Sequence, residues 1–143
     1  MTRDAFIVGI AGVSGIGKST LARELRHALD SPVFPYCLDD YTRTKVVSSR
    51  NEDWNNPRAF NWQGLKDDLK RAKAELRRTD VVPRRIDTQK TQVYTRNNAV
   101  MEPMAGTPLP NPVYIIVEGF LLYLDKDLAD LCDMHLWLEA ESP

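Results

Sequence analysis

Short apolar runs that end at turn residues recur along this chain. Phe6–Ile10 and Val113–Val117 are such runs, and both are typical of strands buried on two faces. Val33–Leu38 and Met134–Leu138 have a similar character and are the other two predicted strands. Because proline lacks the N–H that a central strand needs, Pro35 weakens the strand at Val33–Leu38 or places it near an edge. The pattern therefore predicts four strands, one of them irregular or peripheral.

Apolar residues three or four positions apart predict helices between these strands. One stripe runs through Ser19–Leu29, a second runs through Leu65–Leu76, and a short helix is expected at Lys126–Leu131. The charged residues around the second stripe are interpreted as a solvated surface. The alternation of strands and helices predicts an α/β fold, a parallel sheet with helices on both faces. In such sheets ligands bind beyond the carboxyl ends of the strands.

Two segments lack the periodicity of a helix or strand. Asp39–Asn61 is polar, aromatic and irregular, and we expect it to lie over the sheet as a loop with short turns. Val81–Pro112 contains five prolines among polar residues and is interpreted as a long irregular connection. No internal repeat is present, so residues 1–143 are expected to form one domain.

The composition is that of an ordinary soluble protein, with 43% hydrophobic and 27% charged residues. A net charge of −1 predicts no general attraction to nucleic acid or to membranes, so an anionic ligand needs a local site. No apolar stretch approaches the roughly 20 residues that span a bilayer. The two cysteines, Cys37 and Cys132, suggest neither a zinc site nor a supported disulfide. An intracellular protein of the cytoplasm or nucleus is expected, and the sequence does not indicate its oligomeric state.

A glycine-rich motif between the first strand and the first helix fits the consensus G-x-x-x-x-G-K-S/T. Such a loop curls so that its backbone N–H groups, with the helix N-terminus, hold phosphate oxygens. Lys18 is expected to reach the β and γ phosphates of ATP, and Ser19 to bind Mg²⁺. The strand before the motif and the helix after it argue against a chance match. The predicted nucleotide-binding residues are Gly12, Val13, Ser14, Gly15, Ile16, Gly17, Lys18, Ser19 and Thr20.

Carboxylates follow two other predicted strands, at the same expected edge of the sheet. Asp39 and Asp40 come after the second strand, where a carboxylate would orient an acceptor hydroxyl, accept its proton or hold the metal. The alternative is that one of them caps the next segment. Glu118 leaves the third predicted strand and would serve Mg²⁺, or else pair with Lys18 or cap a helix. The residues after the aspartate pair are expected to line an acceptor pocket; they are Tyr41 and Thr42.

Three blocks of sequence together resemble the nicotinamide riboside kinases, within the wider uridine kinase group. These blocks are Gly12–Thr20, Leu38–Tyr41 and Val117–Tyr123, and Asp53–Phe60 adds a weaker match. The resemblance implies a P-loop NTPase-type fold and transfer of the ATP γ phosphoryl to the 5′ hydroxyl of nicotinamide riboside. It also implies that Asp39 is the proton acceptor near Mg²⁺. Trp54 matches an aromatic residue that stacks on the pyridine ring, although a packing role is the alternative.

The chain departs from this family in two places. Asn55 stands where the family usually has an aspartate that binds the ribose hydroxyls, which predicts weaker or altered ribose recognition. The sequence given stops at Pro143, before the arginine-rich helix, mobile lid, fifth strand and C-terminal helix that the family has. The resemblance therefore implies a fold truncated before the lid and last strand, with weak or absent turnover.

The sequence leaves rival functions open. A related kinase could act on uridine, cytidine, pantothenate or another hydroxylated metabolite, and Trp54 only favours a flat cationic ring. A non-catalytic ATP-binding module is a second alternative. A GTPase is disfavoured, because the guanine-reading motif Asn-Lys-x-Asp does not occur in the chain.

Overall fold

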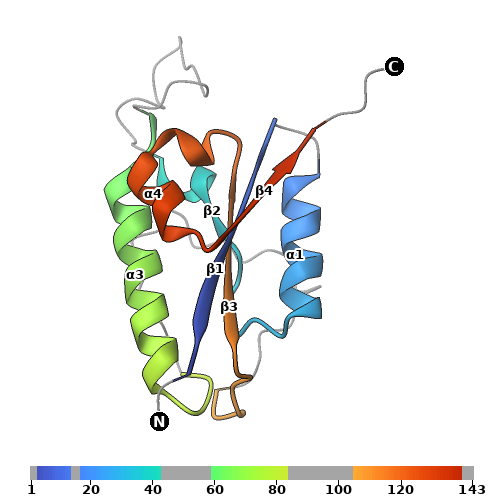
Figure 1. Cartoon of the computed structure of the whole chain (residues 1–143), viewed down its shortest axis with the longest axis vertical. Helices are drawn as coiled ribbons and strands as arrows, with labels where there is room; N and C mark the ends of the chain where they lie inside the picture. Colours follow the sequence, from blue (N-terminus) through green and yellow to red (C-terminus); the bar gives the residue numbers. More distant parts are fainter. Residues whose placement is uncertain (1–2, 14–16, 43–58, 84–104, 140–143) are drawn as a thin grey trace.

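The computed structural model describes residues 3–13, 17–42, 59–83 and 105–139. Its strands form one parallel sheet in the order β2-β3-β1-β4, with β1 at the centre beside β3 (Figure 1). The strands are β1 at Ala5–Gly12, β2 at Tyr36–Cys37, β3 at Val113–Gly119 and β4 at Met134–Leu138. The predicted parallel sheet is confirmed, and the strand weakened by Pro35 lies at its edge.

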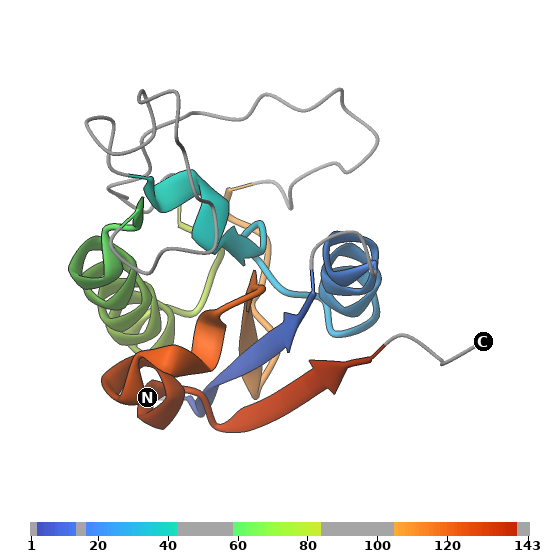
Figure 2. The same ribbon diagram turned by 90° about the horizontal axis from the view of Figure 1, so that it is seen from above.

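Helices cover both faces of the sheet, as the alternation of elements predicts. α1, at Lys18–Ala28, packs on one face. α3, at Trp62–Arg78, and α4, at Lys126–Leu131, lie on the other (Figure 2). Two short 3₁₀ turns complete the described elements: η1 at Leu38–Tyr41 and η3 at Leu122–Leu124. No helix in the described part of the chain is both long and apolar enough to cross a bilayer.

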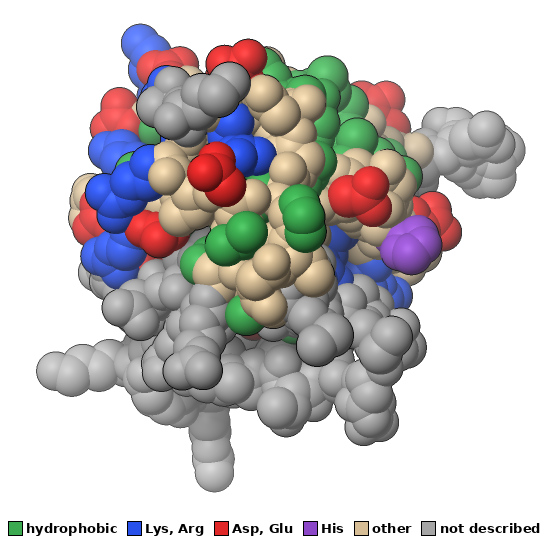
Figure 3. Space-filling view, turned by 90° about the horizontal axis from the view of Figure 1, so that it is seen from below, with side chains coloured by type: hydrophobic (Ala, Val, Ile, Leu, Met, Phe, Trp, Pro, Cys, Tyr) green, Lys and Arg blue, Asp and Glu red, His purple; other side chains and the backbone are tan. Residues whose placement is uncertain are grey.

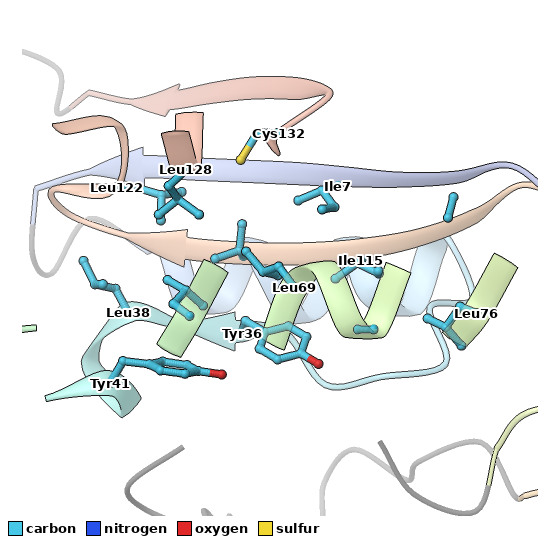
Figure 4. Packing of buried hydrophobic residues seen from close by; sticks show 14 of the residues in the cluster. Ile7, Tyr36, Leu38, Tyr41, Leu69, Leu76, Ile115, Leu122, Leu128 and Cys132 are labelled. Atoms are coloured by element: carbon cyan, nitrogen blue, oxygen red, sulfur yellow. The ribbon is translucent and has the colours of Figure 1, made fainter. Parts of the chain in front are cut away.

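The alternation of side chains along the strands builds two cores. Ile7 and Ile115 face α3, where they pack with Tyr36 and with the apolar stripe of that helix (Figure 4). Val8 and Ile116 face α1 and pack against its apolar residues. Because both faces are covered, β1 and β3 can be almost continuously apolar. The stripe of α3 is fully buried; its residues are Leu65, Leu69, Ala72 and Leu76.

The register of the strands brings three chain segments to one edge of the sheet. Ala11 of β1 lies beside Gly119 of β3, and Cys37 of β2 lies beside Glu118. The loop after β1, the η1 turn after β2 and the end of β3 therefore meet there. This is the carboxyl edge at which the sequence predicts the ligand-binding residues.

Three predictions about elements need correction. The strand expected at Val33–Leu38 is only two residues long, because the chain turns into η1 at Leu38. β3 continues past Val117 and includes Glu118. The charged surface of α3 is not wholly solvated, because Lys66 is 8% exposed and Asp68 is 0% exposed.

The described ends of the long connection predicted at Val81–Pro112 contain turns and one isolated bridge but no helix or strand, as an irregular connection should. The N–H of Val82 donates to the carbonyl of Thr107 at 2.7 Å, and the N–H of Gly106 donates to the carbonyl of Val82 at 2.9 Å. The guanidinium of Arg3 donates to the carbonyls of Leu109 and Pro110, each at 3.1 Å. The bonds of Val82 join the two ends of the connection to each other. The bonds from Arg3 attach the second end to the segment before β1. Residues 84–104 lie outside the described part.

The two cysteines are free thiols, as expected from the sequence. Burial raises the pKa of the Cys132 thiol to about 12. Among the described residues seen from below, positive and negative side chains are interspersed (Figure 3).

Candidate functional site

The glycine-rich loop joins β1 to α1 at the carboxyl edge of the sheet. Gly17 is the N-cap of α1 and has φ 97°, in the left-handed region that favours glycine. A Cβ placed there would meet no atom within 4 Å, so a side chain would fit. Glycine is favoured at this position because of its backbone conformation. The N–H groups of the first turn of α1, from Lys18 to Thr20, have no partner within the helix and are suited to bind an anion. Ser14, Gly15 and Ile16 lie outside the described residues.

The side chain of Lys18, the first residue of α1, folds back onto the loop that precedes it. Its side chain is 8% exposed, and its ammonium donates to the carbonyl of Val13 at 2.8 Å. The ammonium is therefore held at the loop and is available to phosphate oxygens there.

The side chains of Ser19, in α1, and Glu118, in β3, form a hydrogen bond. The Ser19 hydroxyl donates to Oε2 of Glu118 at 2.5 Å, and Glu118 is 4% exposed. A hydroxyl and a carboxylate are oxygen ligands of the kind Mg²⁺ takes, so this pair could hold the ion, and the metal role of Glu118 stays a prediction. Within the described residues, no three carboxylate, histidine or cysteine side chains group together as a metal cage. A magnesium ion that arrives with nucleotide phosphates needs only one or two protein oxygens.

Asp39 faces the same region from η1. Burial raises the pKa of its carboxyl, and the nearby Lys18 ammonium opposes that effect by stabilising the charged form. Burial and then the charges of Glu118 and Asp39 raise the pKa of the Cys37 thiol, so both carboxylates also lie near this residue.

Gly119 explains how η1 reaches the end of β3. A Cβ at this position would lie 2.7 Å from Cβ of Leu38, closer than real side chains approach. Glycine therefore lets the residue just before Asp39 pack directly against the residue just after Glu118. The sequence Glu-Gly at the end of a buried strand was the available signal for this close packing.

The other predicted acceptor residues have different surroundings. Asp40 is half-buried, whereas Asp39 is exposed, and Thr42 pairs with Phe60 in an antiparallel bridge. Tyr41 was expected to line an acceptor pocket, but it is fully buried and its hydroxyl donates to Oδ2 of Asp68 at 2.5 Å. The hydroxyl of Tyr41 is therefore bonded inside the core, and a role for this residue at an acceptor pocket stays a prediction. Trp54 and Asn55 lie outside the described residues.

Comparison with known proteins places this site in a family. A model of the phosphoribulokinase/uridine kinase family matches residues 7–142. The chain belongs to this family. The matched range includes the loop after β1, the η1 turn and Glu118, so the likeness covers every segment that forms the described site.

Individual relatives are 27–28% identical to this chain over the aligned residues. The uridine kinase of Halobacterium salinarum is 28% identical over 146 residues, which cover 99% of this chain and 60% of the relative. The uridine kinase of Chlamydia pneumoniae is 27% identical, covering 95% of this chain and 58% of the relative. The nicotinamide riboside kinase of Schizosaccharomyces pombe is 27% identical, covering 99% of this chain and 64% of the relative. The chain thus spans about 60% of the length of the first of these curated relatives.

Proposed function

We propose that this chain binds ATP with Mg²⁺ and transfers the γ phosphoryl group to a hydroxyl of a nucleoside. The observation that carries the proposal is the Ser19–Glu118 hydrogen bond beside Lys18 and Asp39, at the carboxyl edge of a parallel sheet. A magnesium ligand set, a cation and a second carboxylate are the parts that phosphoryl transfer needs. Membership of the phosphoribulokinase/uridine kinase family supports the same class of reaction.

Each residue then has a defined role. The loop from Gly12 to Thr20 and the ammonium of Lys18 hold the β and γ phosphates. Ser19 and Glu118 would hold Mg²⁺, directly or through water, with Asp39 as a further oxygen ligand. The metal would supply positive charge to the transferring group when ATP is bound at the loop.

Asp39 orients the acceptor hydroxyl and takes its proton late in the transfer. Burial raises the pKa of this carboxyl, which favours proton acceptance, whereas a bound Mg²⁺ would lower it. Phosphoryl transfer passes through a loose transition state, so the position of the hydroxyl matters more than the strength of the base. A weak base is therefore sufficient.

We propose nicotinamide riboside, phosphorylated at its 5′ hydroxyl, as the acceptor. The Leu38–Tyr41 and Val117–Tyr123 blocks resemble the kinases of that nucleoside, and an indole such as Trp54 would attract a cationic pyridine ring. Asn55 would bind the ribose through its amide oxygen, with less strength than a carboxylate. The S. pombe relative that bears this name supports the choice.

Uridine or cytidine is the second candidate acceptor, and the names of several relatives favour it. A competition assay with nicotinamide riboside and uridine in one reaction distinguishes the two. A preference for uridine that Trp54→Ala leaves unchanged would contradict the first choice. Asn55→Asp is expected to strengthen binding of the preferred nucleoside, because it restores a charge-assisted bond to the ribose.

The central test combines binding with transfer. Calorimetry with Mg·ATP is expected to give a heat of binding that Lys18→Ala abolishes. Asp39→Asn is expected to leave ATP affinity nearly unchanged and to lower turnover at least about 100-fold, because it removes the group that aligns the hydroxyl. Binding without transfer, with or without a nucleoside, would instead indicate a non-catalytic ATP-binding module. No binding that depends on Lys18 would overturn the proposal.

A further inference from the structure

A buried tyrosine–aspartate pair joins η1 to α3. Tyr41 and Asp68 are both fully buried, and their hydrogen bond spans 27 positions of the chain. Burial, followed by the hydrogen bond to Asp68, raises the pKa of the Tyr41 hydroxyl, so the phenol is the donor at all ordinary pH values. Figure 4 shows Tyr41 and Tyr36 beside α3, on the side of the sheet where that helix packs.

Stability alone gives little reason for this pair. A buried carboxylate loses its hydration, and an apolar pair of the same shape is commonly as stable or more stable. The guanidinium of Arg71 lies 3.8 Å from Oδ1 of Asp68, but the Arg71 side chain is 50% exposed, so water screens much of that attraction. An apolar contact does not fix the orientation of a side chain, whereas a hydrogen bond does. The bond to Asp68 therefore holds the phenol of Tyr41 at one position on α3.

The same tyrosine is attached to α3 at its backbone as well. The carbonyl of Tyr41 accepts from the N–H of Asn61 at 2.5 Å. Asn61 is the N-cap of α3 and accepts from the N–H of Gly64 at 3.0 Å. The bridge between Thr42 and Phe60 continues this contact. Both ends of Tyr41 are therefore fixed to one rigid helix.

Asp39 lies two residues before Tyr41 within the same four-residue turn. Its orientation depends on how the turn is held, and at its other end η1 is held by Leu38, which is buried in the core and packs against Gly119. We propose that Asp68 is a positioning residue for phosphoryl transfer, which acts through the Tyr41 hydroxyl to hold η1 and thereby aim Asp39 at the acceptor hydroxyl. This inference rests on the proposed function and adds α3 to the acceptor side of the site.

The test separates positioning from stability by replacing both partners together. The paired variant Tyr41→Phe with Asp68→Leu removes the hydrogen bond without leaving a buried charge. We expect its stability to equal or exceed that of the parent protein, while kcat falls about 10- to 100-fold and the KM for Mg·ATP stays unchanged. Asp68→Asn should keep most of the parent kcat, because its amide oxygen still accepts from Tyr41.

Tyr123→Phe is the matched control. It also removes a largely buried hydroxyl, one that donates to the carbonyl of Gly9 at 2.7 Å and accepts from the N–H of Leu136 at 3.0 Å. This control is expected to lower stability and to leave kcat per folded molecule unchanged. A folded paired variant with the parent kcat would overturn the inference.

Amide hydrogen exchange keeps the inference testable if the parent chain transfers no phosphate. In that case the proposed function fails, but the paired variant should still show faster exchange in residues 38–41 and unchanged exchange in β1 and β3. Unchanged exchange in residues 38–41 would show that the pair does not hold the turn, whatever reaction the protein catalyses.

Discussion

At the scale of single residues, Asp39 has conflicting surroundings. Asp39 as a whole residue is exposed, yet desolvation raises the pKa of its carboxyl, and the charge of Lys18 acts in the opposite direction. The outcome is a raised pKa, so burial is the larger effect. A carboxylate kept in such a place stabilises the fold poorly and is better explained by a task at the site.

This balance predicts how stability changes with pH. Because the pKa of Asp39 is raised from its ordinary value of 3.8, the folded protein binds this proton more tightly than the unfolded chain does. The free energy of unfolding therefore falls as the pH rises between these two pKa values, and the loss persists at neutral pH. We expect Asp39→Asn to be more stable than the parent at about pH 7, with a difference that disappears near about pH 3.

Urea unfolding at a series of pH values, without nucleotide, measures this difference. Asp40→Asn is the matched control, because Asp40 is the adjacent aspartate in the same turn and the substitution removes the same charge. An Asp39→Asn variant that is less stable than the parent at neutral pH would contradict the assignment of burial as the larger effect.

Sequence patterns locate some of these residues and miss others. The loop consensus identifies Lys18 and Ser19, because phosphate binding requires those types at fixed spacing. Glu118 can be found because it leaves a buried strand. Asp68 cannot be found in this way, since an aspartate on a charged helix has the same pattern whether its partner is water or a distant tyrosine. Its partner is 27 positions away, and only the fold brings the two together.

At the scale of elements, α3 and α4 are joined by a largely buried ion pair. The ammonium of Lys66 lies 3.1 Å from Oδ2 of Asp125, and their side chains are 10% and 21% exposed. Asp125 is also the N-cap of α4 and accepts from the N–H of Leu128 at 2.9 Å. One carboxylate thus begins a helix of only six residues and holds it to its neighbour.

Removing that carboxylate should cost more than removing its partner. Asp125→Ala deletes the cap and leaves the Lys66 ammonium largely buried, so we expect a loss of about 2–3 kcal/mol in the free energy of unfolding. Lys66→Met keeps the cap and fills the space with an apolar chain, for a loss below about 1 kcal/mol.

Urea unfolding measures both variants of the α3–α4 pair. Arg78→Ala is the control, because the Arg78–Glu75 pair is exposed and should contribute less than about 1 kcal/mol. Equal losses for Asp125→Ala and Lys66→Met would show that capping of α4 contributes little.

Element types follow from the sequence more readily than element lengths do. The predicted helix at Lys126–Leu131 and the predicted strand at Met134–Leu138 match α4 and β4, because caps and turn residues bound them. The second strand is shorter than its apolar pattern suggests. Leu38 is apolar because it packs against Gly119 from a 3₁₀ turn, and apolar character alone does not separate a buried turn from a strand.

At the scale of the whole molecule, the proposed ligand joins segments that are distant in sequence. Mg·ATP would contact the loop after β1, the start of α1 and the end of β3, which are neighbours only in the folded sheet. A ligand that binds the folded state alone stabilises that state by mass action. At a free concentration about 100-fold above Kd, the expected gain is about 2.7 kcal/mol.

Thermal unfolding with and without Mg·ATP measures that gain. The increase in Tm should disappear in Lys18→Ala and should be smaller when EDTA removes the metal, because the contribution of Ser19 and Glu118 is then lost. An equal increase in Tm for the parent and for Lys18→Ala would indicate that ATP stabilises the protein from another site.

The length of β2 has a consequence for local opening. Only Tyr36 and Cys37 join this strand to the sheet, through pairing with Val117 and Glu118. With so few backbone bonds, the strand and the turn after it depend on the buried side chains of Tyr36, Leu38 and Tyr41 to stay in place. Truncation of one of these side chains would therefore release the acceptor side locally, while β1 and β3 keep the phosphate loop intact.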